Sequence, residues 1–416
     1  MELAHAQNVA VAAPAASRAA ALRWWLIAPT LVVFVIVNQL DKTNISVLIA
    51  SPRFVSDLGA TGQHARLGFL ATAFFIGYGL SLMVWGFVVD RIGPRRSALF
   101  GVAGWAVTTA WCGFASSLTT MYVARFALGV TEGCMWPVCN TYAGRWFPAR
   151  EHGRIQAFWI NGAQIGVAIG LPTVTAILLA AGWRAVFFVF AAGSVCLLAP
   201  AFYWLAPDYP VGRPSAGPRP TGAPNLLFLR SPRFWLVSLC HACLVATFFG
   251  LTTWIPTYLT KARGLSFTTM TAWVAAAYMI PVGLALLIGY AADCSMRRAR
   301  VGALASVAMA VMILAAVIVP NTIVSMLLLV VSMAAPITYG AVNTSLMHAF
   351  VPPEQIGRAT GIFVGVANVL GGAAPTVVGW LIGIFRGEYL AAFGFIGALN
   401  LFQAILYTLL GRREEP

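Results

Sequence analysis

Apolar residues run through this chain in long windows that short polar turns separate. Each window holds about 20 residues, the length at which a helix crosses the hydrocarbon core of a bilayer. The apolar positions do not alternate with polar ones at the period of a strand, so the windows predict helices rather than a barrel. Twelve windows are predicted, centred near residues 35, 78, 106, 131, 165, 195, 245, 279, 310, 333, 369 and 400.

Composition agrees with this pattern. Sixty per cent of the 416 residues are apolar and 9% are charged, whereas about a quarter of the residues of a soluble protein carry charge. Too few polar side chains are present to cover a water-exposed surface. The sequence therefore predicts an all-α integral membrane protein whose main environment is the lipid bilayer.

The net charge of +14 comes from basic loops on one side of the membrane. With both termini in the cytoplasm, 18 of the 26 Lys and Arg residues fall on the cytoplasmic side and six fall outside. This asymmetry follows the positive-inside rule. It predicts a multi-pass protein of the cell (inner) membrane with cytoplasmic termini, and it gives no reason to expect a nucleic-acid partner.

One long polar break, rich in Pro and Gly, divides the windows into six and six. Such a composition predicts a flexible cytoplasmic linker. The expected organisation is a disordered tail (1–23), a six-helix bundle (24–206), the linker (207–232), a second six-helix bundle (233–410) and a short tail (411–416).

The two halves share several positions at one offset. Gly86-x-x-x-Asp90 is followed 203 residues later by Gly289-x-x-x-Asp293, and Gln164 is followed 204 residues later by Asn368. Coincidences at a common offset on equivalent helices indicate a duplicated unit. Parallel repeats are a transporter architecture, with the binding site between the halves near the midplane.

Several motifs resemble those of a known family. GFVVDRIGPRR resembles the signature loop of the major facilitator superfamily, and ARFALGVTEG resembles its second motif. Together with LDKTNIS, EGCMWP and WIPTYLTKARGLS, the chain resembles the anion:cation symporters of that superfamily along nearly its whole length. The resemblance implies two pseudo-symmetric six-helix bundles and import of organic anions, such as sugar acids or aromatic carboxylates, with protons.

The chain departs from the family pattern at two positions. Pro94 stands where the signature loop often has a basic residue, and Lys42 stands where the family usually has Arg. Lysine lacks the planar fork that binds a carboxylate through two hydrogen bonds, so this part of an anion clamp is predicted to be looser or suited to another head group.

Four charged residues lie deep in the predicted helices: Asp41, Lys42, Arg125 and Glu132. Each costs on the order of 3 kcal/mol at a helix centre, so they are expected to face a cavity or one another. Arg125 and Glu132 are two turns apart and share a helix face. A purely structural alternative is an ion-pair network that fixes helix packing.

The functional interpretation assigns the cations to an anionic substrate and the acids to protons. Asp41 is predicted to turn toward the fourth helix, while Lys42 reaches into the cavity and forms a two-cation clamp with Arg125. Because an anion would compete with the acids for these cations, binding would be linked to protonation. The family resemblance likewise implies Asp41 and Glu132 as proton carriers and Arg125 as a substrate contact.

Further candidates surround these charges. Gln164 and Asn368 are predicted polar ligands, although the glycines beside them also suit close helix packing. Asn44 is predicted to orient the carboxyl of Asp41. Tyr78 and Trp254 are candidates to line the cavity, with anchoring at the membrane interface as the alternative.

A further set of candidates lies in the cytoplasmic loops. These residues are predicted to stabilise one conformation of the protein. We predict a charge latch that holds the outward-open state, with orientation by positive charge as a compatible second role. Its residues are Gly86, Asp90, Arg91, Gly93, Arg95, Arg145 and Arg154.

Other classes of function find less support in the sequence. The five histidines are scattered and no metal-ligand or nucleophile–base set is present, so neither an enzyme nor a cofactor is predicted. A proton-coupled exporter of a drug or metabolite is the alternative transport function. The sequence predicts a monomer, and it leaves open which organic anion is carried, whether sodium replaces the proton, and whether exchange replaces import.

Overall fold

The computed structural model describes residues 23–148, 151–209, 227–276, 278, 298–332, 340, 342–344, 346–347, 350–351 and 356–411. These residues are helical or in turns, and they contain no strand. The predicted windows near residues 279 and 333 extend beyond the described residues. Nine spans within the described ranges are long and apolar enough to cross a membrane: Arg23–Ala50, His64–Ile92, Pro94–Phe114, His152–Ala181, Trp183–Leu205, Pro232–Ala262, Ala299–Ile318, Ala359–Ile384 and Leu390–Gly411.

The first half of the chain begins with a π-helical turn and continues in α-helices. The fourth and fifth predicted windows each contain two helices joined without a loop, α6 with α7 and α8 with α9. The elements are η1 (Arg23–Ile27), α2 (Ala28–Ala50), α3 (Pro52–Asp57), α4 (His64–Ile92), α5 (Pro94–Phe114), α6 (Leu118–Glu132), α7 (Met135–Trp146), α8 (His152–Ile160), α9 (Gly162–Ala181), α10 (Trp183–Pro200) and η3 (Ala201–Leu205).

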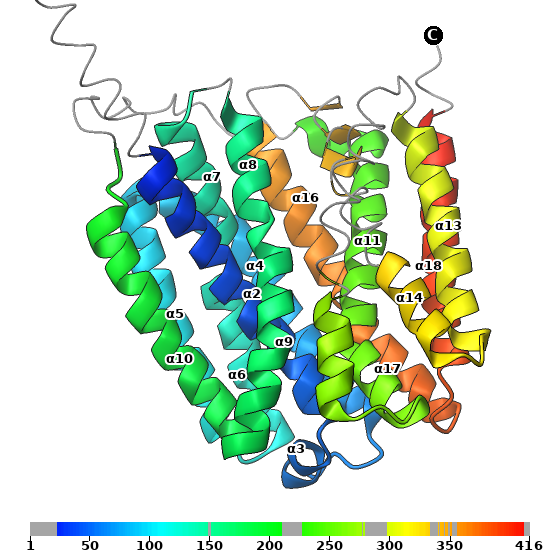
Figure 1. Cartoon of the computed structure of the whole chain (residues 1–416). Helices are drawn as coiled ribbons and strands as arrows, with labels where there is room; N and C mark the ends of the chain where they lie inside the picture. Colours follow the sequence, from blue (N-terminus) through cyan, green and yellow to red (C-terminus); the bar gives the residue numbers. More distant parts are fainter. Residues whose placement is uncertain are drawn as a thin grey trace, which may run out of the picture.

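The second half lies beside the first, on the right in Figure 1. Its described elements are η4 (Leu227–Arg230), α11 (Pro232–Thr257), η5 (Tyr258–Ala262), α13 (Arg298–Ile318), α14 (Thr322–Ser332), α16 (Ile356–Gly371), α17 (Ala374–Ile384) and α18 (Leu390–Gly411). The start of η1 and the end of α18 lie on the same side of the molecule, which we call the terminal side; α3 lies on the opposite, far side (Figure 1).

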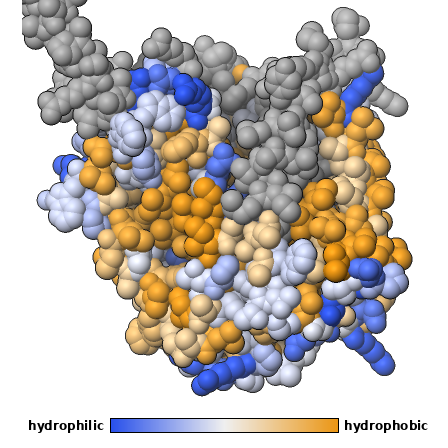
Figure 2. Space-filling model, viewed as in Figure 1, coloured by the Kyte–Doolittle hydropathy of each residue, from blue (hydrophilic) through white to orange (hydrophobic). Residues whose placement is uncertain are grey.

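The surface carries an apolar belt. Figure 2 shows hydrophobic residues between hydrophilic residues on the terminal side and on the far side. Large apolar side chains remain exposed along the helices, including Phe87 at 71%, Phe100 at 66% and Leu304 at 73%. Such extensive apolar exposure suits lipid rather than water, as the composition predicts for a multi-pass membrane protein.

Glycines allow the helices of the first half to approach closely. On α9, Gly162, Gly166 and Gly170 face α2, and a methyl group added at Gly166 would lie 2.8 Å from the carbonyl oxygen of Ile36. These glycines therefore let α9 pack closely against α2. On α6, a methyl group at Gly129 would overlap the carbonyl oxygen of Phe74, so α4 and α6 cross at backbone contact.

The two halves close against each other toward the far side. One face of α4 carries Gly68, Thr72, Phe75 and Gly79 along this seam. A methyl group at Gly68 would overlap the carbonyl oxygen of Pro375 in α17. Thr376 Oγ1 lies 2.7 Å from Thr72 Oγ1, and the ring of Phe75 lies 3.9 Å from that of Phe249 between centroids. We call this contact the far-side seam.

Candidate anion and proton site

The four charged residues that the sequence places deep in the helices are buried in the first half. Asp41, Arg125 and Glu132 are 0% exposed and Lys42 is 8% exposed. Asp41 and Lys42 lie on α2, whereas Arg125 and Glu132 lie on α6. What matters for their chemistry is which groups each one contacts.

The carboxylate of Asp41 lies against α5. Its Oδ2 accepts a hydrogen bond from Trp105 Nε1 at 2.5 Å, and its Oδ1 accepts one from Asn44 Nδ2 at 3.4 Å. Its side-chain hydrogen bonds thus go to α5 and to its own helix, and the predicted orientation toward the fourth helix stays a prediction. The buried indole N–H needs an acceptor, and the carboxylate supplies it. Nothing in the local sequence pattern singled out Trp105.

Arg125 is held by backbone carbonyls. Its Nη1 donates to the carbonyl oxygen of Asp41 at 3.2 Å, and its Nε donates to that of Leu70 at 3.4 Å. The guanidinium carbon lies 4.9 Å from the centre of the Phe74 ring. Its Nη2 is buried and has no hydrogen-bond partner in the part of the chain that the structure describes.

Lys42 rests on an aromatic ring. Its Nζ lies 3.9 Å from the centre of the Tyr78 ring, a cation–π contact. The hydroxyl of Tyr78 is buried and lies near the indole of Trp136. Tyr78 thus stands beside a cation, and its role as a substrate contact stays a prediction.

Glu132 is bound by a neutral donor. Its Oε2 accepts a hydrogen bond from Asn38 Nδ2 at 2.7 Å, while its Oε1 is buried without a partner among the described residues. Asn38 was not among the predicted site residues. A signal for it existed, since Asn38 is an amide three residues before Asp41 in an otherwise apolar window.

The two cations lie near the buried acids without forming a salt bridge among the described residues. In the described ranges, no carboxylate oxygen lies within 4.0 Å of Lys42 Nζ or of the Arg125 guanidinium. Contacts as short as those of an ion-pair network, the purely structural alternative, are therefore absent from the described part of the chain.

Three other predicted ligands differ in their surroundings. Gln164 is half-buried on α9. Asn368 is 6% exposed on α16, and its Nδ2 donates to the carbonyl oxygen of Val364 in its own helix at 2.8 Å. The indole of Trp254 is fully buried and donates to the carbonyl oxygen of Pro375 at 2.9 Å. In this conformation Trp254 packs α11 against α17 instead of lining a cavity.

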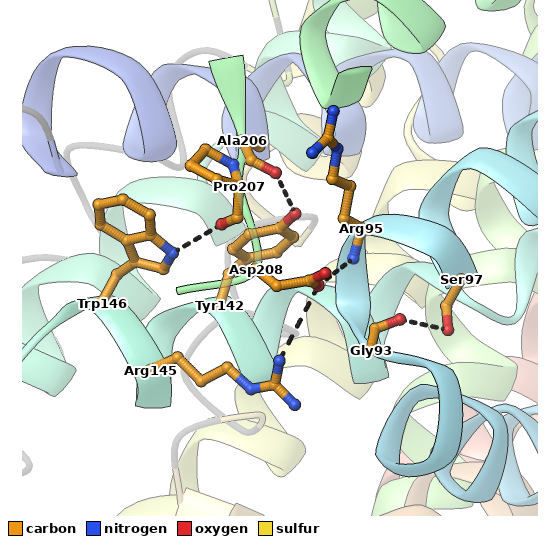
Figure 3. A network of polar contacts seen from close by, with 9 residues as sticks. All are labelled: Gly93, Arg95, Ser97, Tyr142, Arg145, Trp146, Ala206, Pro207 and Asp208. Carbon is orange, nitrogen blue, oxygen red and sulfur yellow. Dashed lines mark hydrogen bonds and ion pairs between the residues drawn. The ribbon is translucent and has the colours of Figure 1, made fainter. Parts of the chain in front are cut away.

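The predicted latch residues lie on the terminal side, where Figure 3 shows a network around Asp208. Gly93 has a φ of 87°, and the backbone N–H of Arg95 donates to Asp208 Oδ1 at 2.9 Å. Arg145 Nη1 lies 3.9 Å from the same oxygen. Asp208, which the sequence places in the flexible linker, is thus the residue that Arg95 and Arg145 share.

The chain around Asp208 is fixed from the same side. Tyr142 donates from its hydroxyl to the carbonyl oxygen of Ala206 at 2.7 Å, and Trp146 Nε1 donates to that of Pro207 at 3.0 Å, as drawn in Figure 3. The first residues of the predicted linker therefore pack on α5 and α7. Residues 210–226 of that linker lie outside the described residues.

The remaining latch residues are near the surface. Gly86 borders open space, and Asp90 and Arg91 are exposed at the end of α4. The guanidinium carbon of Arg154 lies 5.4 Å from the centre of the Trp24 ring. These contacts, like those of Asp208, lie within the first half, and a charge latch that holds the outward-open state stays a prediction.

Residues 31–375 match the family model described as Major Facilitator Superfamily. The chain belongs to this superfamily. It is a multi-pass membrane transporter and not an enzyme, because transport is the activity of the family and of the curated relatives.

Its relatives include the probable sulfoacetate transporter SauU of Cupriavidus necator, 29% identical over 87% of this chain and 88% of the relative. The D-galactonate transporter of Escherichia coli is 24% identical over 90% and 93%, and the hexuronate transporter of Bacillus subtilis is 24% identical over 89% and 90%.

Solved structures support the same fold. A bacterial homologue of the human lysosomal transporter Spinster, in an inward-facing conformation, is similar with a TM-score of 0.74 at 17% identity over 93% of this chain and 96% of that one. A D-xylose-proton symporter gives 0.73 at 17% over 92% and 96%.

Proposed function

We propose that this transporter imports a small organic anion across the cell (inner) membrane by proton symport with alternating access. The termini, and with them the terminal side, are cytoplasmic in this proposal, as the distribution of basic residues supports. The observation that carries the proposal is a pair of buried cations, Lys42 and Arg125, without a carboxylate within 4.0 Å in the described ranges.

Two unpaired cations suit a substrate with a compact anionic group. Arg125 retains a buried Nη2 without a hydrogen-bond partner among the described residues, and Lys42 offers a point charge over the ring of Tyr78. A carboxylate or sulfonate bound between them gains charge-assisted hydrogen bonds. The relatives named as carriers of sulfoacetate, D-galactonate and hexuronate support an organic anion of this kind.

Two buried acids beside the same cations supply a route for proton coupling. Asp41 and Glu132 are each bound by neutral donors, Trp105 and Asn38. An anion that binds near ionised carboxylates is repelled by them in a medium of low dielectric constant. A proton on either acid removes that repulsion, so the anion and the proton bind more favourably together than apart.

Alternating access requires that the site be closed to one side at a time. The far-side seam provides such a closure, since α4 meets α17 at backbone contact and Thr72 meets Thr376 by a hydrogen bond. We interpret this conformation as one that blocks the external path and releases substrate to the cytoplasm.

The proposal is tested with the purified protein in lipid vesicles. Sulfoacetate, D-galactonate, a hexuronate and benzoate are added to de-energised vesicles, and the external pH is recorded. The expected result is alkalinisation with at least one anion, together with accumulation of that anion when an inward proton gradient is imposed. Efflux driven by the same gradient would instead support the exporter, and accumulation driven by sodium alone would rule out proton symport.

A further inference from the structure

Trp105 contacts an acid that we assign to proton coupling, although it stands on a different helix. Its indole is fully buried, and its Nε1 lies 2.5 Å from Asp41 Oδ2. The ring packs beside Phe34 of α2, with centroids 6.1 Å apart. An indole has one polar hydrogen and no acceptor, so this hydrogen bond is the one polar contact that the side chain can make.

Asp41 is consequently held from two directions. Trp105 and Asn44 donate to its carboxylate, while Arg125 donates to its main-chain carbonyl oxygen. The side chain is drawn toward α5, and the guanidinium of Arg125 lies beyond 4.0 Å of the carboxylate oxygens. The arrangement separates an acid and a base that a buried salt bridge would otherwise join.

We propose that Trp105 is a positioning residue for proton coupling. It holds the carboxylate of Asp41 away from Arg125, so that a proton neutralises the acid and the cation stays available for the anion. The transport part of this inference rests on the proposed function. The contact between Trp105 and Asp41 is testable without any substrate.

Other charged and titratable groups near Asp41 also influence its titration, so the test must keep them unchanged. Arg125 and Glu132 face it from α6, and Cys112 faces it from α5. Lys42 follows it on α2 and contacts Tyr78 of α4. The variants below leave all of these in place, so a change in titration is attributable to the lost indole donor.

The experiment is an infrared titration of the purified protein across pH. The carboxyl band of Asp41 is identified by its loss in Asp41→Asn. In Trp105→Phe, which keeps an aromatic ring without the donor, the midpoint of this band is expected to move away from that of the parent, because the carboxylate loses the indole donor and is released toward Arg125. Trp105→Met is a second variant without the donor, should the first not purify.

The matched control is Trp111→Phe, on the same helix and 39% exposed, which is expected to leave the midpoint unchanged. Trp105→Gln restores an N–H donor and is expected to recover most of the shift. An unchanged midpoint in both Trp105→Phe and Trp105→Met would overturn the inference.

Anion transport is the second readout. It separates a failure of the proposed proton symport from a failure of the positioning role of Trp105. In vesicles, the pH profile of anion uptake by Trp105→Phe is expected to move in the same direction as the band. If the parent moves no protons with any anion, the proposed function fails while the infrared midpoint still tests the contact. If the parent is proton-coupled and Trp105→Phe has the profile of the parent, the positioning role is refuted.

Discussion

Lys42 and Arg125 differ in how tightly the protein holds them. Arg125 is fixed by two backbone carbonyls, whereas Lys42 rests on the Tyr78 ring. We expect Lys42→Ala and Arg125→Ala each to weaken anion binding by roughly 2–5 kcal/mol, because the substrate charge would be left half-paired. Lys42→Arg is expected to retain binding and to shift preference among anions. Calorimetric binding is the measurement, and parental affinity in both alanine variants would assign the charges to packing.

The two acids are expected to separate accumulation from exchange. Glu132→Gln and Asp41→Asn should lose proton-driven accumulation, since neither amide can carry a proton, while counterflow of substrate across the vesicle membrane persists. Uptake against a gradient and counterflow are measured on the same vesicles. Concentration of substrate by Glu132→Gln would remove this residue from the coupling mechanism.

Asp57 on the far side makes a pH-dependent contact. The indole N–H of Trp183 donates to its carboxylate at 2.8 Å, and together with the nearby Arg184 it lowers the pKa of Asp57 below the ordinary 3.8. A lowered pKa stabilises the folded state above the ordinary value, and this contribution is lost as the pH falls through the folded value. Asp57→Asn should therefore lower the melting temperature at pH 7 and have less effect near pH 3. An equal effect at both would contradict this.

At the scale of elements, the side chain of one arginine caps the C-terminus of a helix. Arg263 Nη2 donates to the carbonyl oxygens of Ala316 and Val319 at 3.1 and 2.8 Å, and its Nη1 donates to that of Pro320 at 3.1 Å. These oxygens lie at the C-terminus of α13, where intrahelical donors are lacking.

Replacing this arginine should destabilise α13. Arg263→Lys keeps the charge but loses the planar fork, and we expect a loss of about 2 kcal/mol in the free energy of unfolding. Lys261→Arg, at an exposed position two residues earlier, is the control. Chemical denaturation in detergent measures both, and equal stability of Arg263→Lys and the parent would assign the capping to the charge alone.

At the scale of the whole molecule, the far-side seam joins the two halves at backbone contact. A methyl group at Gly68 would overlap the backbone of Pro375, so Gly68→Ala is expected to disfavour closure on that side and to reduce transport severalfold while the protein still folds. Gly383→Ala in α17, where a methyl group meets nothing within 4 Å, is the control. Unchanged transport in Gly68→Ala would show that the seam opens and closes without this contact.

Much of the fold followed from local properties of the sequence. A span is recognised by its length and apolarity, and the windows that became α2, α4 and α11 required no knowledge of their neighbours. Two boundaries were less visible. The breaks between α6 and α7 and between α8 and α9 occur without a polar loop, so a window average cannot detect them. Asp208 was assigned to the linker because composition does not reveal that Tyr142 and Trp146 bind the adjacent carbonyls.

The sequence by itself determined that this is a membrane protein, because the length and apolarity of a span are local properties. It also determined which charged residues lie within the spans, because the cost of a charge in an apolar window is local as well. These residues are Asp41, Lys42, Arg125 and Glu132. Only the tertiary structure decided what each charge contacts. Asp41 pairs with Trp105, 64 residues away, and this choice depends on how α2 and α5 are rotated and how closely they approach. Rotation and approach are set by side-chain packing across helices, which no single window of sequence contains.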